Sequence, residues 1–551
     1  MRIEFLFSNN SFLDHSSSQE PPTTTHKQTN NCTMVSTDIE CTQSKPPKPR
    51  RIAIVGGGGI SGLQTIRALR ARGFNVTAYE GSDKVGGIWK SNYSNFSVQV
   101  PRVLFEFQDF PMSEIGWNDY ATGVQVQHYI EAYAVKFDLL DSIQFNAYVT
   151  SVKLQPDHQS WSVEVTVQNK KHVEQFDYVI IASGLYSGTN QFIPNWTGKE
   201  YFRGEIVHSC QFYDASVAKD KRVVVIGGGK SAVDIAVEAA VHKAAKVTLM
   251  PREMHWPSPR ILLGLIRTHS ILMSRLGLSL VCSQSGSFPT DSIVSTRSRL
   301  LGMLTTPLYK LYGMVVAWQF NLRGKLYPRT EVMRDFYNIH YSVNNDLTNM
   351  RKEGKVDLIV GEIDEFQKDG STLALKDGST LSADLVVSAT GFHENYSFFD
   401  NPQKMLNIED DGVYMYRFML PQNIPNLAFI GHVNAVSNIG CYGLQAEWLA
   451  RYLAGDLVEE VTPEKIKRDI ERRKSWARNF MPKSKVRGMT ILLHETHYWD
   501  VLLMDMGLSP YRKSNIFAEY IMPYGPSDYN GIIGMPKPKK IYRRSFWYAQ
   551  A

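Results

Sequence analysis

A glycine-rich loop between a predicted strand and a predicted helix restricts the fold more than any other feature of this sequence. Residues 51–56 form a run that is apolar and rich in β-branched residues after Arg51 and ends in glycine, which is typical of a buried parallel strand. The pattern GxGxxG follows in the only register that the glycines allow, and we predict a helix over 63–72 and a second strand over 75–80. The loop residues that we expect to contact a dinucleotide are Gly57, Gly58, Gly59, Ile60, Ser61 and Gly62.

Each glycine of the pattern has its own physical reason. Gly57 permits a tight turn, Gly59 lets the backbone approach a pyrophosphate, and Gly62 lets the helix pack on the strand. The pyrophosphate binds the exposed N–H groups at the helix N-terminus. Glu80 ends the second strand, where a carboxylate accepts a hydrogen bond from a ribose 2′-hydroxyl. This unit therefore suits a nucleotide without a 2′-phosphate, such as FAD.

The same unit recurs further along the chain. Residues 221–226 predict a buried strand, a helix runs to about 244, and 246–250 predict the next strand. This strand leads to Arg252 instead of an acid, and a guanidinium binds a phosphate bidentately. Arg252 therefore favours NADP over NAD, the alternative being an ordinary surface arginine. The expected loop contacts, in a GxGxxA variant, are Gly227, Gly228, Gly229, Lys230, Ser231 and Ala232.

Two dissimilar nucleotide sites imply an electron relay, in which NADPH at the second site reduces a flavin at the first. An NAD dehydrogenase needs only one such unit, and a disulfide reductase with two units also needs a redox cysteine pair. The cysteines lie far apart, with neither CxxC nor zinc-type spacing. Residues 494–497 read HExH instead of HExxH, so we predict no metal. The electrons must therefore go to another acceptor, and we expect that acceptor to be oxygen.

The domain order follows from two apolar strands, 178–184 and 385–391, which end alike in Ala-x-Gly and flank the second unit. We predict an α/β fold with two Rossmann-like dinucleotide-binding domains, the NADPH domain inserted into the FAD domain. The predicted parts are a disordered leader over 1–48, the FAD domain over 49–212 and 383–551 with a C-terminal extension, and the NADPH domain over 213–382 with a helical insert at about 256–332.

Charge and hydropathy exclude some partners. The net charge of +6 comes without a local basic cluster, so we expect no nucleic-acid partner. No apolar stretch reaches a membrane span, and the segments 261–282 and 300–320 predict amphipathic helices. The alternatives for these two segments are a place in the buried core, a substrate lid, or contact with a membrane surface. We expect a cytoplasmic protein, at the endoplasmic reticulum surface if that contact exists, and leave its oligomeric state open.

The segment 202–212 carries a family resemblance. It matches FxGxxxHxxx(Y/F) through Phe202, Gly204, His208 and Phe212, the identifying pattern of the flavin-containing monooxygenases, which are class B flavoprotein oxygenases. From about residue 50 to 530 the chain resembles plant members of this family, although it is longer than the YUCCA members. The further matching motifs are GGxW at 86–89, DFP at 109–111 and ATG(Y/F) at 389–392.

The resemblance implies cofactors and candidate site residues. In this family NADPH reduces FAD, oxygen adds at flavin C4a, and the hydroperoxide oxidises a soft nucleophile. Gly87 and Trp89 of GGxW are then expected near the flavin. Animal members carry a Thr-Asn pair shortly before DFP, and Gln99 takes the place of that amide here, with Asn95 as the fallback. Both are alternatively ordinary polar loop residues.

Three functions are weighed on this basis. The first is N-hydroxylation of an amino-acid amine with molecular oxygen, giving an N-hydroxy amino acid or an oxime. The second is S-oxygenation of a thioether by the same machinery. The third is a non-catalytic flavoprotein that binds nucleotide without turning it over, which the intact glycines at both sites disfavour.

Overall fold

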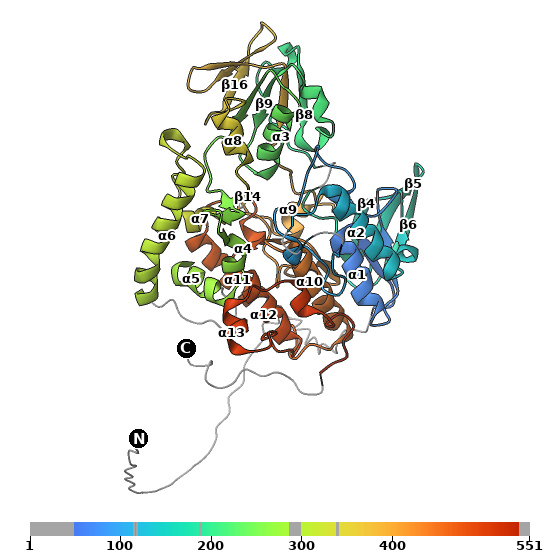
Figure 1. Cartoon of the computed structure of the whole chain (residues 1–551). Helices are drawn as coiled ribbons and strands as arrows, with labels where there is room; N and C mark the ends of the chain where they lie inside the picture. Colours follow the sequence, from blue (N-terminus) through green and yellow to red (C-terminus); the bar gives the residue numbers. More distant parts are fainter. Residues whose placement is uncertain are drawn as a thin grey trace, which may run out of the picture. The chain divides into compact units, whose positions relative to one another are not determined.

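The structure is a computed structural model that describes residues 49–113, 116, 119–186, 190–285, 299–337 and 341–538 (Figure 1). The predicted leader lies outside these ranges. So do residues 286–298 of the predicted insert and 539–551 of the predicted C-terminal extension.

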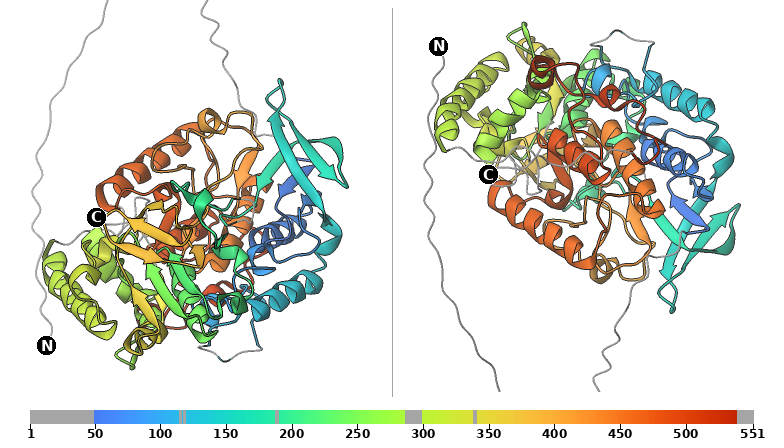
Figure 2. Two further views of the ribbon diagram at one scale, coloured as in Figure 1. Left: turned by 90° about the horizontal axis from the view of Figure 1, so that it is seen from above. Right: turned by 90° about the horizontal axis from the view of Figure 1, so that it is seen from below.

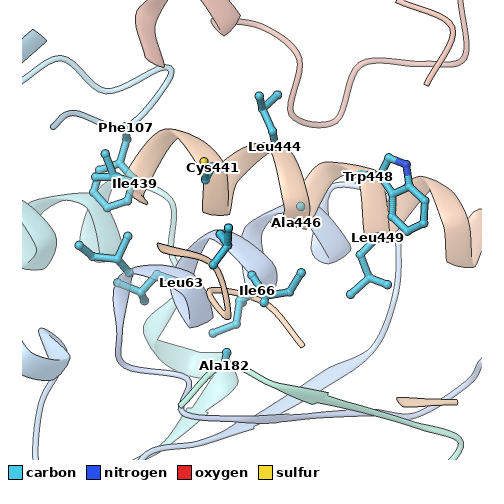
Figure 3. Close-up of a cluster of buried hydrophobic side chains, with 14 of the residues drawn as sticks. Leu63, Ile66, Phe107, Ala182, Ile439, Cys441, Leu444, Ala446, Trp448 and Leu449 are labelled. Carbon is cyan, nitrogen blue, oxygen red and sulfur yellow. The ribbon is translucent and has the colours of Figure 1, made fainter. Parts of the chain in front are cut away.

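The first nucleotide unit is built on a five-stranded parallel sheet in the order β20-β7-β1-β2-β3. Helix α1 (Ile60–Arg70) follows β1, and α10 (Asn438–Ala454) packs against it. Figure 3 shows Leu63 of α1 and Leu444 of α10 in the buried cluster that these two helices share. The strands are β1 (Ile52–Val55), β2 (Val76–Tyr79), β3 (Ile143–Gln144), β7 (Tyr178–Ile181) and β20 (Leu427–Phe429).

The second unit is another five-stranded parallel sheet, in the order β15-β10-β9-β19-β8, with α3 (Lys230–Val241) packed on β9 and β10. The chain leaves the first sheet after β7 and returns to it at β20, so the second sheet is an insertion. Because β8 and β19 belong to this sheet, it begins earlier and ends later than the predicted boundaries at 213 and 382. The strands are β8 (Glu205–His208), β9 (Arg222–Ile226), β10 (Lys246–Met250), β15 (Val356–Leu358) and β19 (Leu385–Ser388).

The segment 261–282 does not form the single amphipathic helix that we predicted. Strands β12 (Ile261–Leu262) and β13 (Ile266–Arg267) form a hairpin before α4 (Thr268–Leu272) and α5 (Arg275–Ser285). The helix cannot continue through the turn because Leu263 and Gly264 have φ of +55° and +73°. The predicted helix over 300–320 is α6 (Arg299–Gln319). Within the described ranges, none of the helices combines the length and apolar character needed to traverse a bilayer.

The remaining elements cover the two sheets. Figures 1 and 2 show α5 and α6 on one side of the molecule, opposite the antiparallel sheet β4–β6. The other strands are β4 (Ala147–Leu154), β5 (Trp161–Val167), β6 (Lys170–Phe176), β11 (Ser258–Pro259), β14 (Ser342–Val343), β16 (Ile363–Phe366), β17 (Thr372–Leu375), β18 (Thr380–Ser382), β21 (Asn434–Ala435) and β22 (Thr490–Leu492). The other helices are α2 (Gly123–Lys136), α7 (Val332–Asp335), α8 (Asp346–Lys352), α9 (Pro402–Met405), α11 (Pro463–Phe480), α12 (Glu495–Asp505) and α13 (Ile516–Ile521).

Candidate functional site

The first glycine loop turns at Gly56, one residue before the glycine to which we assigned the tight turn. Gly56 has φ of +89°, a conformation that residues with a side chain rarely adopt. Gly57 lies against β2, where an added Cβ would stand 2.6 Å from Ala78 Cβ. Gly62 packs against the loop so closely that a Cβ would overlap the carbonyl oxygen of Gly56. Because these glycines have no side chains, the helix, the strand and the loop can pack closely against one another.

Gly59 leaves open space at the start of α1. A Cβ built there meets no heavy atom within 4 Å, although the glycines around it are tightly packed. Gly59 is the N-cap of α1, and the first N–H groups of a helix have no acceptor inside it. Open space beside unpaired donors fits a pyrophosphate, as the dinucleotide assignment requires.

Two further sequence-predicted residues reach this loop. The Glu80 carboxylate accepts a hydrogen bond from the Gly58 N–H (2.9 Å) and another from the Ser82 N–H (3.0 Å). The Gly86 N–H donates to the Gly58 carbonyl oxygen (2.8 Å), which brings the adjacent Gly87 beside Gly59. Both the acid and the GGxW segment therefore adjoin the predicted pyrophosphate site.

Ser61 and Trp89 are held by neighbours within the first unit. The Ser61 hydroxyl donates to the carbonyl oxygen of Ala182, at the end of β7 (3.0 Å). The Trp89 ring stacks on Phe96, with ring centres 5.7 Å apart, and meets Phe105 edge-on at 5.1 Å. Ser61 therefore fixes the loop to the sheet, while Trp89 belongs to an aromatic cluster beside it.

The second loop repeats the pattern of packed and open glycines. Gly227 has φ of +141° and packs against the Ala389 carbonyl, while Gly228 lies over Pro251. A Cβ on Gly229 meets nothing within 4 Å, as at Gly59. Arg252 follows β10 and its side chain is exposed. The open glycine and the exposed guanidinium fit a second dinucleotide that carries an additional phosphate.

The loop at 93–95 of the first unit contacts α3 of the second. Lys230 forms an ion pair with Asp234, whose carboxylate also accepts the Tyr93 hydroxyl (3.0 Å). Burial lowers the pKa of Lys230. One turn further on, the Asn95 amide donates to Glu238 (2.7 Å). Asn95 therefore lies at this contact between the units.

His208 ends β8, an edge strand of the second sheet. Its ring is 2.8 Å from the Gly391 carbonyl oxygen through Nε2, and Nδ1 accepts the Cys210 N–H at 3.3 Å. Burial lowers the pKa of His208, so its ring is neutral at pH 7. The motif that suggested the family therefore joins the end of β8 to the end of β19.

The HExH segment serves packing around α10. Glu495 accepts hydrogen bonds from the N–H groups of Val436 and Ser437 (2.7 and 2.9 Å), and burial raises its pKa to about 8. Among the residues described, no group of three or more His, Cys, Asp or Glu side chains is placed to hold a metal ion.

A small cavity separates the first unit from the segment after β10. Its walls come from residues 99–101, Tyr120 and Val436 of the first unit and from residues 258–260, 268–269 and 272–273. Gln99 lines this cavity, whereas Asn95 does not. Tyr120 and Arg260 could not be identified from the sequence, because no motif marks them and the cavity forms only when distant segments meet.

Comparisons with known proteins agree with this arrangement. Residues 49–511 match the family described as flavin-binding monooxygenase-like. A probable flavin-containing monooxygenase 1 of Arabidopsis thaliana is 27% identical over 530 residues, 87% of this chain and 96% of the relative. Human flavin-containing monooxygenase 1 is 30% identical over 456 residues, 78% of each chain.

Solved structures share the fold. S-allyl-L-cysteine S-oxygenase from Allium sativum superimposes with a TM-score of 0.58 at 19% identity, over 84% of this chain and 90% of its own. Cyclohexanone monooxygenase from Rhodococcus sp. Phi1 bound to NADP+ gives 0.61 at 18% identity, over 82% and 97%.

The fold and the two glycine loops define a class of oxidoreductases that bind two dinucleotides. Within that class, the chain belongs to the flavin-binding monooxygenase-like family. It is an NADPH-dependent flavin monooxygenase whose cofactors are FAD and NADPH. The family, the enzyme class and the fold class predicted from the sequence are thereby confirmed.

Proposed function

We propose that this monooxygenase hydroxylates the amine nitrogen of an amino acid, giving an N-hydroxy amino acid or an oxime. The observation that carries the proposal is the cavity beside Gln99, which combines one cation, Arg260, with several apolar residues and no acid. An amino acid has the complementary carboxylate and side chain. A mouse relative named as an N-oxide-forming dimethylaniline monooxygenase, 28% identical over 491 residues, supports oxidation at nitrogen.

The proposal divides the nucleotide contacts between the two loops. We assign Gly57–Gly62, Glu80, Gly87 and Trp89 to FAD, and Gly227–Ala232 with Arg252 to NADPH. When bound, the two cofactors supply the electrons and the oxygen-transfer chemistry. The chain's own groups would hold the phosphates, exclude water with the aromatic cluster around Trp89, and orient the substrate.

S-oxygenation of a thioether is the second candidate. It is favoured by the shared fold with the Allium sativum enzyme, an S-allyl-L-cysteine S-oxygenase. Mass spectrometry of products from an amino-acid panel with NADPH and heavy oxygen, ¹⁸O₂, separates the two. We expect the label on nitrogen. Label on sulfur would establish the second candidate, and unlabelled substrate with peroxide release would contradict both.

The Gln99 amide is proposed to donate a hydrogen bond to the oxygen that is being transferred. Gln99→Leu should then lower product formation about tenfold, since one lost hydrogen bond of about 1.4 kcal/mol has this effect, and should raise peroxide released per NADPH consumed. Both are measured together by product and peroxide assays. Unchanged coupling in Gln99→Leu with peroxide leakage in Asn95→Leu would move the role to Asn95.

We also propose that α6 and the β12–β13 hairpin contact a membrane surface. The exposed side of α6 carries Leu308, Leu311, Met314 and Trp318, and Leu265 on the hairpin is 84% exposed. No acidic residue lies in α6. Apolar side chains on a cationic helix are typical of interfacial attachment.

Vesicle co-sedimentation tests this contact. Binding to vesicles that contain anionic lipid should fall at least severalfold in the double variant Leu311→Ser and Trp318→Ser. Val124→Ser with Val135→Ser on α2, which are also exposed, should leave it unchanged. Equal binding by the two double variants, or no binding by the unaltered protein, would contradict the proposal.

A further inference from the structure

Arg260 places a guanidinium in the cavity without an ion-pair partner among the described residues. Its Nη2 donates to the Val98 carbonyl oxygen (3.3 Å), and its guanidinium carbon lies 3.8 Å from the centre of the Tyr120 ring. Its Nε is buried without a hydrogen-bond partner in the described part of the chain. Asp234 and Asp346 act on it only through longer-range electrostatics.

Arg260 is partly buried, and even partial burial of an unpaired cation is costly. Burial lowers the pKa of Arg260, which means that the surroundings disfavour its charged form. Buried charges are ordinarily paired, because the desolvation of an isolated ion is only offset by a counter-charge. An anionic ligand in the cavity would supply that charge.

Neighbouring polar atoms in the same cavity also lack partners. Thr268 Oγ1 and His269 Nδ1 are buried without hydrogen bonds within the described ranges. Burial, aided by Arg267, lowers the pKa of His269 to about 4, so this ring is neutral at pH 7. Arg260 is therefore the one lasting charge on the cavity wall, beside two neutral hydrogen-bonding groups.

The rest of the wall is apolar. Leu272 and Met273 come from α4 and the residue after it, and Val436 comes from the segment before α10. The cavity now measures about 30 Å³, which has room for water but not for an amino acid. Its lining must therefore move apart when a larger ligand enters.

We propose that Arg260, stacked on Tyr120, binds the α-carboxylate of the substrate, while Leu272, Met273 and Val436 contact an apolar side chain. This assignment rests on the proposed oxygenation and specifies its substrate class: amino acids that keep a free carboxylate and carry an apolar side chain. A guanidinium binds a carboxylate by a charge-assisted, bidentate pair.

A phosphate of NADPH, like a carboxylate, is an anion that a guanidinium can bind. The direct contacts of Arg260 favour the substrate, because they are with Val98 and Tyr120 of the first unit. Only longer-range electrostatics connect it to Lys230 and Asp234 of α3. Arg252, by contrast, is exposed next to the second glycine loop. Separate measurements of amino-acid and NADP⁺ binding distinguish these two sources of negative charge.

Binding is measured on the oxidised, FAD-loaded enzyme with NADP⁺, so that no turnover occurs. The probes are phenylalanine and methionine, each paired with its decarboxylated counterpart, phenethylamine and 3-(methylthio)propylamine. Calorimetry and thermal shift on the unaltered enzyme should detect at least one of the amino acids and neither amine. Equal binding of an amino acid and its amine, or no binding by any probe, would overturn the assignment.

Two arginine variants complete the test. Arg260→Met should weaken amino-acid binding about 10- to 150-fold, the loss expected for one charge-assisted pair, and Arg260→Lys should weaken it less. Arg351→Met is the matched control, since Arg351 also has its pKa lowered by burial but lies in a different cavity. Amino-acid affinity unchanged in Arg260→Met, or a loss confined to NADP⁺, would overturn the assignment.

The outcomes keep the two proposals apart. If amino acids bind through Arg260 but acquire no ¹⁸O, the proposed oxygenation fails and the carboxylate site stands. If amino acids acquire ¹⁸O equally well in the unaltered enzyme and in Arg260→Met, the oxygenation stands and the carboxylate site fails.

Discussion

Gly59→Ala is expected to give a folded protein that does not retain FAD. The backbone at this position is extended, with φ of −80° and ψ of 169°, so alanine fits without strain. In the absence of a nucleotide the added Cβ meets nothing within 4 Å. With FAD bound, the same methyl group would occupy the space where the pyrophosphate approaches the backbone. Flavin content by visible absorbance, after purification and after incubation with FAD, checks the result.

Gly229→Ala is the matched control because its Cβ is equally unhindered in the second loop. This variant should be yellow and fully loaded with flavin, yet should be reduced poorly by NADPH. Circular dichroism should show both variants folded. A fully loaded Gly59→Ala protein would contradict the assignment of FAD to the first loop. Gly62→Ala is unsuitable, since its Cβ would overlap the loop backbone.

Arg252→Ala is expected to raise the KM for NADPH about 10- to 150-fold while leaving the KM for NADH unchanged. The range corresponds to the loss of one charge-assisted pair, about 1.5–3 kcal/mol. Arg252 is exposed, so its loss should leave the fold intact, and unchanged NADH kinetics would verify this. Both nucleotides are therefore measured by steady-state oxidation.

Lys219→Ala provides the control for net charge. Lys219 is exposed just before β9, whereas the glycine loop follows the other end of that strand. Its loss should change neither KM by more than a small factor. If Arg252→Ala raised the KM for NADPH and for NADH equally, the argument for a 2′-phosphate contact would be lost.

The two nucleotide units could be predicted because their signals are local. Apolar runs, glycine spacing and the residue that ends the second strand all lie within about 30 residues of each other, which is the size of a βαβ unit. Helix boundaries that depend on packing differ from the predicted ones. Helix α1 begins at Ile60, three residues before the predicted start at Leu63, because burial against the sheet outweighs the poor helix propensity of Gly62.

The cavity could not be predicted in the same way. Gln99 was reached only by counting from a family motif, and Arg260 carries no motif. Arg260 directly precedes a hairpin at 261–267, which we predicted as part of a helix. The turn that creates it needs a left-handed Leu263, which no propensity favours. Long-range packing therefore determines the candidate substrate site, whereas local pattern determines the cofactor loops.

Anaerobic mixing of the purified protein with NADPH tests the central claim most directly, namely that NADPH at the second loop reduces FAD at the first. We predict a flavin spectrum that NADPH bleaches much faster than NADH does, and that returns when oxygen is admitted. A colourless protein that takes up no FAD, or a bound flavin that NADPH leaves oxidised, would contradict the account.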